Sequence, residues 1–212
     1  DQYQQQVRGL LRVSCSVAGR RQLVPLVTEF IALYPQVKVA LQLEDRLVDL
    51  IAEQIDVAIR ASSLVDSSLV AHKLAESPRV VVASPAYLAR AGTPRTPQEL
   101  TNHACLVYAG ADRVYDKWNF IGENGQFKMR VNGVLQINDG EALATAAVGG
   151  AGIVLILRHL VADEIERGGL VELLSGYALP PAPAIYAVYP ARDWLALKTS
   201  TFIAFLQERL GR

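Results

Sequence analysis

Apolar residues along this chain fall into two kinds of pattern. Residues 80–83, with the sequence Val-Val-Val-Ala, form an uninterrupted run, which is typical of a strand buried on both faces of a sheet. Elsewhere apolar residues recur at intervals of three and four, as they do on a helix, at Leu23, Leu26, Val27, Phe30, Ile31 and Tyr34. Strands that alternate with helices predict an α/β fold, in which ligands bind at the carboxyl ends of parallel strands.

The same patterns predict the order of elements along the whole chain. Strands are expected at residues 10–14, 37–43, 57–60, 69–74, 80–83, 105–108, 117–121, 127–131, 134–137, 153–157, 170–174 and 185–189. Helices are expected at residues 21–34, around 47–51, and at 85–91, 142–148, 160–166 and 195–210. The Asn-Gly pair at positions 124 and 125 predicts a hairpin between two of the strands.

Several helix ends can be assigned from single residues. The Ser-Pro pair that begins at Ser84 is expected to start a helix, because the serine hydroxyl can cap free N–H groups. Thr96 and Glu99 have the spacing of a capping box. The glycine-rich cluster at residues 149–152 follows a helix and precedes a strand, the reverse of a dinucleotide-binding loop. We therefore interpret it as a helix stop.

Composition narrows the class of protein. The 212 residues include 21 basic and 21 acidic ones, so the chain lacks the positive excess of a nucleic-acid-binding protein. No apolar run approaches the roughly 20 residues of a membrane helix, and the start lacks a secretion-signal pattern. Cys15 and Cys105 lie in apolar strand patterns. We expect them to be buried, reduced thiols of a cytoplasmic protein.

Motifs of enzymes and of metal sites are missing from the sequence. The chain has no GxSxG, HExxH, paired CxxC or GxxxxGK[ST] motif, and its histidines are widely separated, at positions 72, 103 and 159. We therefore expect no catalytic residues, no metal and no cofactor. The sequence favours a protein that is not an enzyme.

Four segments, in order along the chain, carry a resemblance to a known family. They are LRVSCSVAGRRQLVPLVTEFIALYPQVKVALQL, DLIAEQIDVAIRAS, SSLVAHKLAESPRVVVASPAYL and NDGEALATAAVGGAGIVLIL. Together they resemble the effector-binding domain of LysR-type transcriptional regulators, over about residues 8–209. A solute-binding protein of a transporter, which shares the fold, is the alternative.

The resemblance implies a fold like that of type 2 periplasmic solute-binding proteins. Two Rossmann-like α/β lobes would be joined by two crossover strands, with the effector in the cleft between them. The first lobe would comprise residues 8–78 and 186–212, and the second residues 79–185. The glutamine-rich residues 1–7 would be the remnant of a linker helix.

The resemblance also implies how such a chain acts in a longer protein. The family's winged helix-turn-helix domain precedes the linker helix, so DNA would be bound only through that missing domain. Effector binding would shift lobe and dimer geometry and so control transcription. The chain is expected to form a homodimer, with a tetramer in the full-length protein. The helices at residues 21–34 and 141–148 are the expected pairing surfaces.

Candidate effector-binding residues in the first lobe follow strand ends. One group lies between a strand and a helix, where unpaired N–H groups favour an anion, and it comprises Ser16, Val17, Ala18 and Gly19. An ordinary strand-to-helix turn is the alternative. Arg60 and Ala61 follow the next strand, and the arginine could clasp a carboxylate. An ion pair with Asp56 or Asp66 is the alternative for Arg60.

Candidate residues in the second lobe occupy similar junctions. They are Ser84, Tyr108, Gly110, Asn138, Asp139 and Glu141. Ser84 is expected to be a helix cap first and a ligand donor second, and Asp139 is either a ligand or the cap of the helix that follows it. The expected effector is a small organic anion, and no contact with a membrane is expected.

Overall fold

The computed structural model describes residues 7–46, 48–61, 69–110, 113–191 and 195–211. The chain divides into two units, one of residues 1–77 and 183–212 (unit 1) and one of residues 78–182 (unit 2). The two internal divisions, after residues 77 and 182, lie one and three residues before those expected between the lobes. Of the expected linker remnant, residues 1–6 lie outside the described residues. Val7 is fully buried in the core of unit 1, so it packs as part of that unit.

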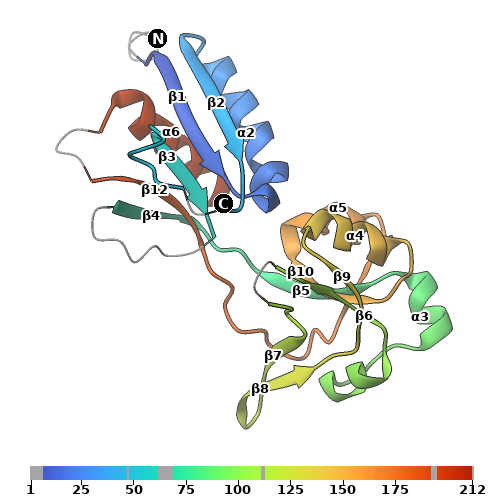
Figure 1. The fold of residues 1–212 in the computed structure, drawn as a ribbon. Helices are drawn as coiled ribbons and strands as arrows, with labels where there is room; N and C mark the ends of the chain where they lie inside the picture. The colour runs from blue at the N-terminus through green and yellow to red at the C-terminus, as the bar shows by residue number, and fades with distance from the viewer. Residues whose placement is uncertain (1–6, 47, 62–68, 111–112, 192–194, 212) are drawn as a thin grey trace. The chain divides into compact units, whose positions relative to one another are not determined.

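Unit 1 is a mixed five-stranded sheet with two long helices. Its elements are β1 (Gly9–Cys15), η1 (Val17–Gly19), α2 (Arg20–Leu33), β2 (Val37–Leu43), β3 (Val57–Arg60), β4 (Leu69–Ala75), β12 (Ile185–Pro190) and α6 (Leu197–Leu210). The strand order is β2-β1-β3-β12-β4, as Figure 1 shows. Strands β1, β2 and β3 are parallel, whereas β12 is antiparallel to both of its neighbours. The carboxyl ends of β1, β2 and β3 therefore share one edge of the sheet.

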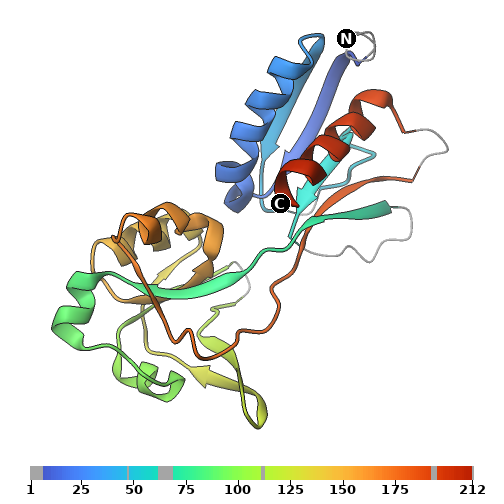
Figure 2. The same ribbon diagram turned by 180° about the vertical axis from the view of Figure 1, so that it is seen from behind.

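Both long helices of unit 1 cover the same face of its sheet, and Figure 2 shows them in front of it. Phe30 of α2 meets Phe202 of α6 edge to face, with ring centroids 4.9 Å apart, and both side chains are fully buried. Arg209 of α6 donates to Glu29 of α2 at 2.7 and 2.9 Å. These contacts join the chain's last helix to its first, which stabilises a unit built from two distant segments.

One expected element of unit 1 is wrong. The helix expected around residues 47–51 is not formed: residues 50–54 make turns, and Leu47 lies outside the described residues. The Asp49 carboxylate accepts from the N–H groups of Ile51 and Ala52, and Gln54 has a φ of 54°. That left-handed residue stops the chain after one turn, because the left-handed conformation does not continue a right-handed helix.

Unit 2 is a second five-stranded sheet with a separate hairpin. Its elements are β5 (Arg79–Ala83), α3 (Pro85–Ala91), η2 (Pro97–Asn102), β6 (Cys105–Tyr108), β7 (Lys117–Gly122), β8 (Gly125–Arg130), β9 (Gly133–Ile137), α4 (Gly140–Val148), β10 (Ile153–Leu157), η3 (Arg158–Leu160), α5 (Ala162–Glu166) and β11 (Val171–Leu173). The strand order is β11-β5-β10-β6-β9, and β7 pairs with β8 as predicted.

The two faces of this sheet bury different side chains of β5. Val80 and Val82 lie with α4 and α5 on one face, and Val81 and Ala83 lie with α3, η2 and the hairpin on the other. The apolar run at residues 80–83 is thus buried on both sides, as its composition predicted.

The direction of β5 decides which residues of unit 2 share an edge. Strands β10, β6 and β9 are parallel, but β5 is antiparallel to β10, with Arg79 opposite Leu157. The amino end of β5 therefore lies at the edge where β6, β9 and β10 have their carboxyl ends. Ser84, which follows β5, lies at the opposite edge.

Helix starts in unit 2 confirm two of the three expected caps. Ser84 Oγ accepts from the N–H of Tyr87, and Asp139 Oδ1 accepts from the N–H of Ala142. The capping box at Thr96 is wrong: its side chain makes no cap hydrogen bond, and η2 is a short 3₁₀-helix. The Glu99 carboxylate accepts instead from the N–H of Arg95, one residue before Thr96.

The expected helix over residues 160–166 is also shorter than its apolar pattern suggested. Its first residue belongs to the 3₁₀-helix η3, and α5 begins only at Ala162. Val161 lies between the two with a φ of −126°, outside the helical range, so the two pieces do not join.

Candidate functional site

The first candidate group lies at the carboxyl edge of the unit 1 sheet, where β1 leads into η1 and α2. Ser16 stands at the start of η1 with extended backbone, but its side chain makes no cap hydrogen bond. Gly19 packs against the end of the strand: a Cβ at this position would lie 2.6 Å from the sulfur of Cys15. Glycine is therefore required here by close approach, and any larger residue would displace the strand end or the turn.

The N–H groups of this turn were expected to be unpaired, and that expectation is wrong. The Val17 N–H donates to Asp45 Oδ1 at 2.9 Å, and the Gly19 N–H donates to the Ser16 carbonyl at 3.0 Å. Ala18 also has a partner. A carboxylate at a helix start is favourable, since the first turn carries partial positive charge. In this structure that anion belongs to the protein itself.

Arg60, at the end of β3, has neutral hydrogen-bond partners among the residues that the structure describes. Its guanidinium donates to Ser14 Oγ at 2.6 Å and to the Ile59 carbonyl at 3.1 Å. No carboxylate among the described residues forms an ion pair with it. Burial lowers the pKa of Arg60, and the nearby Cys15, Glu44 and Asp45 oppose that shift. Within the described residues, the site therefore holds a half-buried cation without a direct counter-ion.

Of the two ion pairs considered as alternatives for Arg60, the one with Asp56 is wrong. Asp56 accepts from Lys198 Nζ at 2.9 Å and from the Arg12 N–H at 2.8 Å. Asp66 lies outside the described residues. Ala61, next to Arg60, is exposed.

The segment after β2 completes this edge, and sequence reasoning missed it. Glu44 Oε2 lies 2.6 Å from Arg46 Nε, and Arg46 donates to both carboxylate oxygens of Glu53. The other oxygen of Glu44, Oε1, is buried without a hydrogen-bond partner. The signal was available: Glu44 and Asp45 follow a strand parallel to β1, just as Arg60 does. They therefore belong to the same edge.

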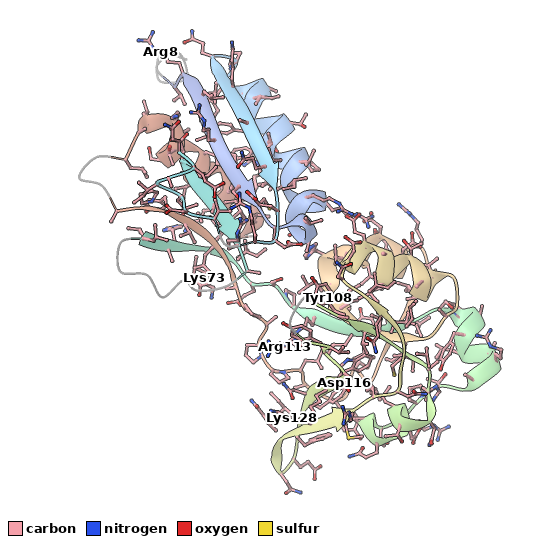
Figure 3. All side chains as sticks on the ribbon, in the orientation of Figure 1. Arg8, Lys73, Tyr108, Arg113, Asp116 and Lys128 are labelled. Carbon is pink, nitrogen blue, oxygen red and sulfur yellow. The ribbon has the colours of Figure 1, made fainter. Side chains whose placement is uncertain are left out.

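In unit 2, Tyr108 and Gly110 lie where β6 leaves the sheet. The Tyr108 side chain is 38% exposed and meets Tyr115 edge to face, with ring centroids 5.8 Å apart. The Arg113 guanidinium lies 4.4 Å from the Tyr115 ring centroid, and Gly110 donates to the Arg113 carbonyl at 3.0 Å. Figure 3 labels Tyr108 and Arg113 on this segment. The arrangement offers aromatic surface beside a cation.

Asn138, Asp139 and Glu141 lie at the start of α4, which follows β9 at the same edge as Tyr108. The Asp139 carboxylate accepts from the Ala142 N–H at 2.7 Å, which confirms the cap. Asn138 is exposed and Glu141 is partly buried. The first turn of α4, like that of α2, thus receives a carboxylate from the chain itself.

Ser84 does not join these residues, which corrects its place in the candidate site. It follows β5 and so lies at the sheet edge opposite Tyr108 and Asn138. Its side chain is 2% exposed and caps α3. Burial and an occupied hydroxyl make it a structural cap.

Both cysteines are buried free thiols, as predicted. Burial raises the pKa of Cys15 to about 11 and that of Cys105 to about 12. No three His, Cys, Asp or Glu side chains in the described ranges are grouped as metal ligands would be. None of the helices formed by the described residues is long and apolar enough to cross a bilayer.

Comparison with known proteins places these features in a family. The model of the LysR substrate binding domain matches residues 4–211. The transcriptional activator TtdR of Escherichia coli is 35% identical over 211 residues, which are 96% of this chain and 67% of TtdR. The solved structure of CrgA, a LysR-type transcriptional regulator from Neisseria meningitidis, superposes with a TM-score of 0.86 at 31% identity, covering 97% of this chain and 69% of that chain. Full-length AphB of Vibrio cholerae gives a TM-score of 0.82 at 28% identity, covering 94% of this chain and 68% of AphB.

Proposed function

The chain belongs to the family of LysR substrate-binding domains, and we propose that its effector is a small organic anion whose carboxylate pairs with Arg60. The family is one of transcription regulators, which confirms the expectation that the chain is not an enzyme. Domains of this family bind small-molecule effectors and oligomerise. The transporter alternative is set aside, because TtdR and CrgA, which match nearly the whole chain, are regulators.

The observation that carries the proposal is the state of Arg60. A half-buried guanidinium whose partners in the described part of the chain are neutral has lost part of its hydration without gaining a counter-charge from them. A ligand carboxylate can supply that charge through two hydrogen bonds, because the planar fork of arginine matches carboxylate geometry. Ser14 already bonds Nη2, so it holds the guanidinium in place for the ligand.

Asp45 is the second residue on which this proposal depends, because its carboxylate occupies the helix start near Arg60. An anionic effector that reaches Arg60 competes with the Asp45 carboxylate for the Val17 N–H. Release of Asp45 would then free the segment after β2. We propose this exchange as the local event by which unit 1 responds to its effector.

Further contacts of the effector are predicted from the family resemblance. The residues concerned are Tyr108, Gly110, Asn138 and Glu141. Their support is that they follow β6 and β9 at one edge of the unit 2 sheet, where α/β folds bind ligands. If Asn138 contacts the effector, the Asn138→Ala variant should bind the effector with lower affinity than the wild type.

The chain spans about two thirds of the length of the curated relatives that it matches. What the whole protein binds and where it acts are therefore proposals. We propose that a helix-turn-helix domain outside this chain binds DNA and that the regulator acts in the cytoplasm. Pairing into a homodimer, and a tetramer when full-length, would use α2 and α4. Their exposed apolar residues include Val24, Ile31 and Val148, which are 40% to 45% exposed.

A paired ligand screen tests the effector class. Thermal unfolding of the chain should be measured with carboxylates and with their neutral amides, each at millimolar concentration. The proposal predicts that the melting temperature rises with at least one carboxylate and not with its amide. Stabilisation by amides and carboxylates alike would contradict an anionic effector.

A further inference from the structure

We propose that unit 2 contains a second ligand site, in a cavity at the amino end of β5, which binds a small carboxylate with an apolar body. The cavity has a volume of about 300 Å³, within the size range of small-molecule sites. Its walls are formed by the adjacent strands β5 and β11, by the segment of residues 174–182 that follows β11, and by Phe120 of the hairpin. All of its lining residues belong to unit 2.

Arg79 supplies the charge of this site. Its Nε is buried without a hydrogen-bond partner, and its guanidinium forms no ion pair with any residue that the structure describes. Val81 lies on the hairpin face of the sheet, and residues two apart on a strand share a face, so Arg79 points to the same side as Phe120. Burial lowers the pKa of Arg79, and no neighbouring charge opposes the shift.

The other charges in the cavity cancel. Arg158 Nη2 lies 2.6 Å from Glu172 Oε2, and both side chains line the wall beside Arg79. The site therefore has one uncompensated positive charge. A carboxylate satisfies it with paired hydrogen bonds to the guanidinium.

The other lining residues favour a ligand whose non-carboxylate part is apolar. Phe120, Tyr177, Leu179 and Pro180 contribute apolar surface. Inorganic phosphate would leave this surface unused and lose its own hydration, whereas an aromatic or branched aliphatic acid covers it. The cavity thus fits an amphiphilic acid better than a small, fully hydrated anion.

This site is separate from the one proposed around Arg60. The lining of the cavity includes neither Arg60 of unit 1 nor the proposed effector contacts of unit 2, which are Tyr108, Gly110, Asn138 and Glu141, so neither proposal depends on the other. Because Arg79 Nε is unpaired and no residue in the described ranges forms an ion pair with Arg79, Arg79→Gln should leave the fold intact, and its melting temperature should match that of the wild type within about 2 °C.

Titration of the isotope-labelled 212-residue chain with benzoate, followed by amide NMR shifts, tests the proposal. Saturable shifts are expected at Arg79, Phe120 and Tyr177, in the wild type and in Arg60→Gln alike. Arg79→Gln should weaken this binding about tenfold. Arg130→Gln, which removes an exposed arginine of the hairpin, is the matched control and should change nothing. Benzamide, the neutral analogue, should not saturate the site.

The second site would be overturned by any of the following outcomes. They are equal affinity of Arg79→Gln and the wild type for benzoate, equal binding of benzamide, and the lack of any shift at the cavity up to 20 mM ligand, roughly the concentration that fills a millimolar site. Benzoate shifts confined to the surroundings of Arg60 would also overturn it while supporting the proposed effector site. Benzoate shifts at the cavity without any around Arg60 would support the second site without supporting the proposed effector site.

Discussion

The carboxylate of Asp45 accepts a hydrogen bond from the backbone N–H of Val17 at 2.9 Å, so a residue that follows β2 occupies the start of η1, the short 3₁₀-helix that leads into α2. This contact places an anion of the protein where an α/β fold favours an anion of the ligand. Asp45 also lies close enough to Arg60 to act on its charge. An anionic effector that binds as we propose would therefore compete with this intramolecular carboxylate for the same positive groups.

Removing Asp45 should strengthen effector binding. Asp45→Ala frees the Val17 N–H and removes a negative charge near Arg60, so the dissociation constant of an anionic effector should fall about three- to tenfold. Calorimetric titration measures the change. Asp116→Ala, which removes a carboxylate paired with Arg130 in unit 2, is the control and should leave the affinity unchanged. Weaker binding to Asp45→Ala would mean that Asp45 organises the site instead of competing for it.

The pair of Asp56 and Lys198 should matter for stability. Both side chains are mostly buried, and Asp56 also accepts from the Arg12 N–H while Lys198 donates to the Leu10 carbonyl. Asp56→Ala leaves a donor and a cation unpaired, so the free energy of unfolding should fall by about 1–3 kcal/mol. Urea unfolding measures it.

The control for that variant is an exposed ion pair. Glu76→Ala breaks the contact with Lys73, whose side chain is 53% exposed, and should change the free energy of unfolding by less than about 0.5 kcal/mol. A similar loss in both variants would show that burial does not distinguish the two pairs.

Gly152 should tolerate no side chain. A Cβ there would lie 2.4 Å from the Ala104 carbonyl oxygen, which is backbone and cannot rotate away. Gly152→Ala should lower the free energy of unfolding by about 2–3 kcal/mol through forced separation of β10 and the segment before β6. Gly176→Ala, with no atom within 4 Å of its new Cβ, is the matched control and should be near neutral. Chemical denaturation of the two variants side by side decides the matter.

The two thiols should resist modification in the folded state. With a pKa of about 11, Cys15 is thiolate in only about one molecule in a thousand at pH 8. A thiol reagent such as DTNB should therefore react with the native chain at least tenfold more slowly than with the urea-unfolded chain. Fast labelling at native conditions would show that the strand ends open readily.

The same thiols predict how stability depends on pH. Their pKa values are raised on folding from an ordinary value of about 9, so the folded state holds its protons more tightly than the unfolded state. The resulting contribution is fully present below about pH 9 and is lost as pH rises toward 11 and 12. Urea unfolding between pH 8 and 10.5, compared with Cys15→Ala, measures this loss.

Local signals in the sequence were sufficient for most strands and helix caps. The apolar run at residues 80–83 and the caps at Ser84 and Asp139 depend on neighbours in the chain, and the structure has them as predicted. The capping box at Thr96 is also a local signal, but Glu99 bonds to the N–H of Arg95 instead. The Glu99 carboxylate could accept from the N–H of Thr96 or of Arg95, and the sequence pattern does not decide between these two donors.

Long-range placement could not be predicted in the same way. Ser84 was grouped with Tyr108 because both follow strands, yet β5 runs antiparallel to its neighbour, which puts them at opposite edges. Asp45 reaches Val17 across 28 positions of the chain, and no periodicity links the two. Direction within a sheet and contacts between strand ends depend on topology, which emerges only when the whole sheet is assembled.

The account depends most on the unpaired charge of Arg60, and one comparison of affinities tests it directly. The carboxylate that raises the melting temperature most should be titrated calorimetrically into the wild type, Arg60→Gln and the control Arg130→Gln. The account predicts at least tenfold weaker binding to Arg60→Gln, about 1.4 kcal/mol, and no change in Arg130→Gln. Equal affinity of the wild type and Arg60→Gln would contradict it.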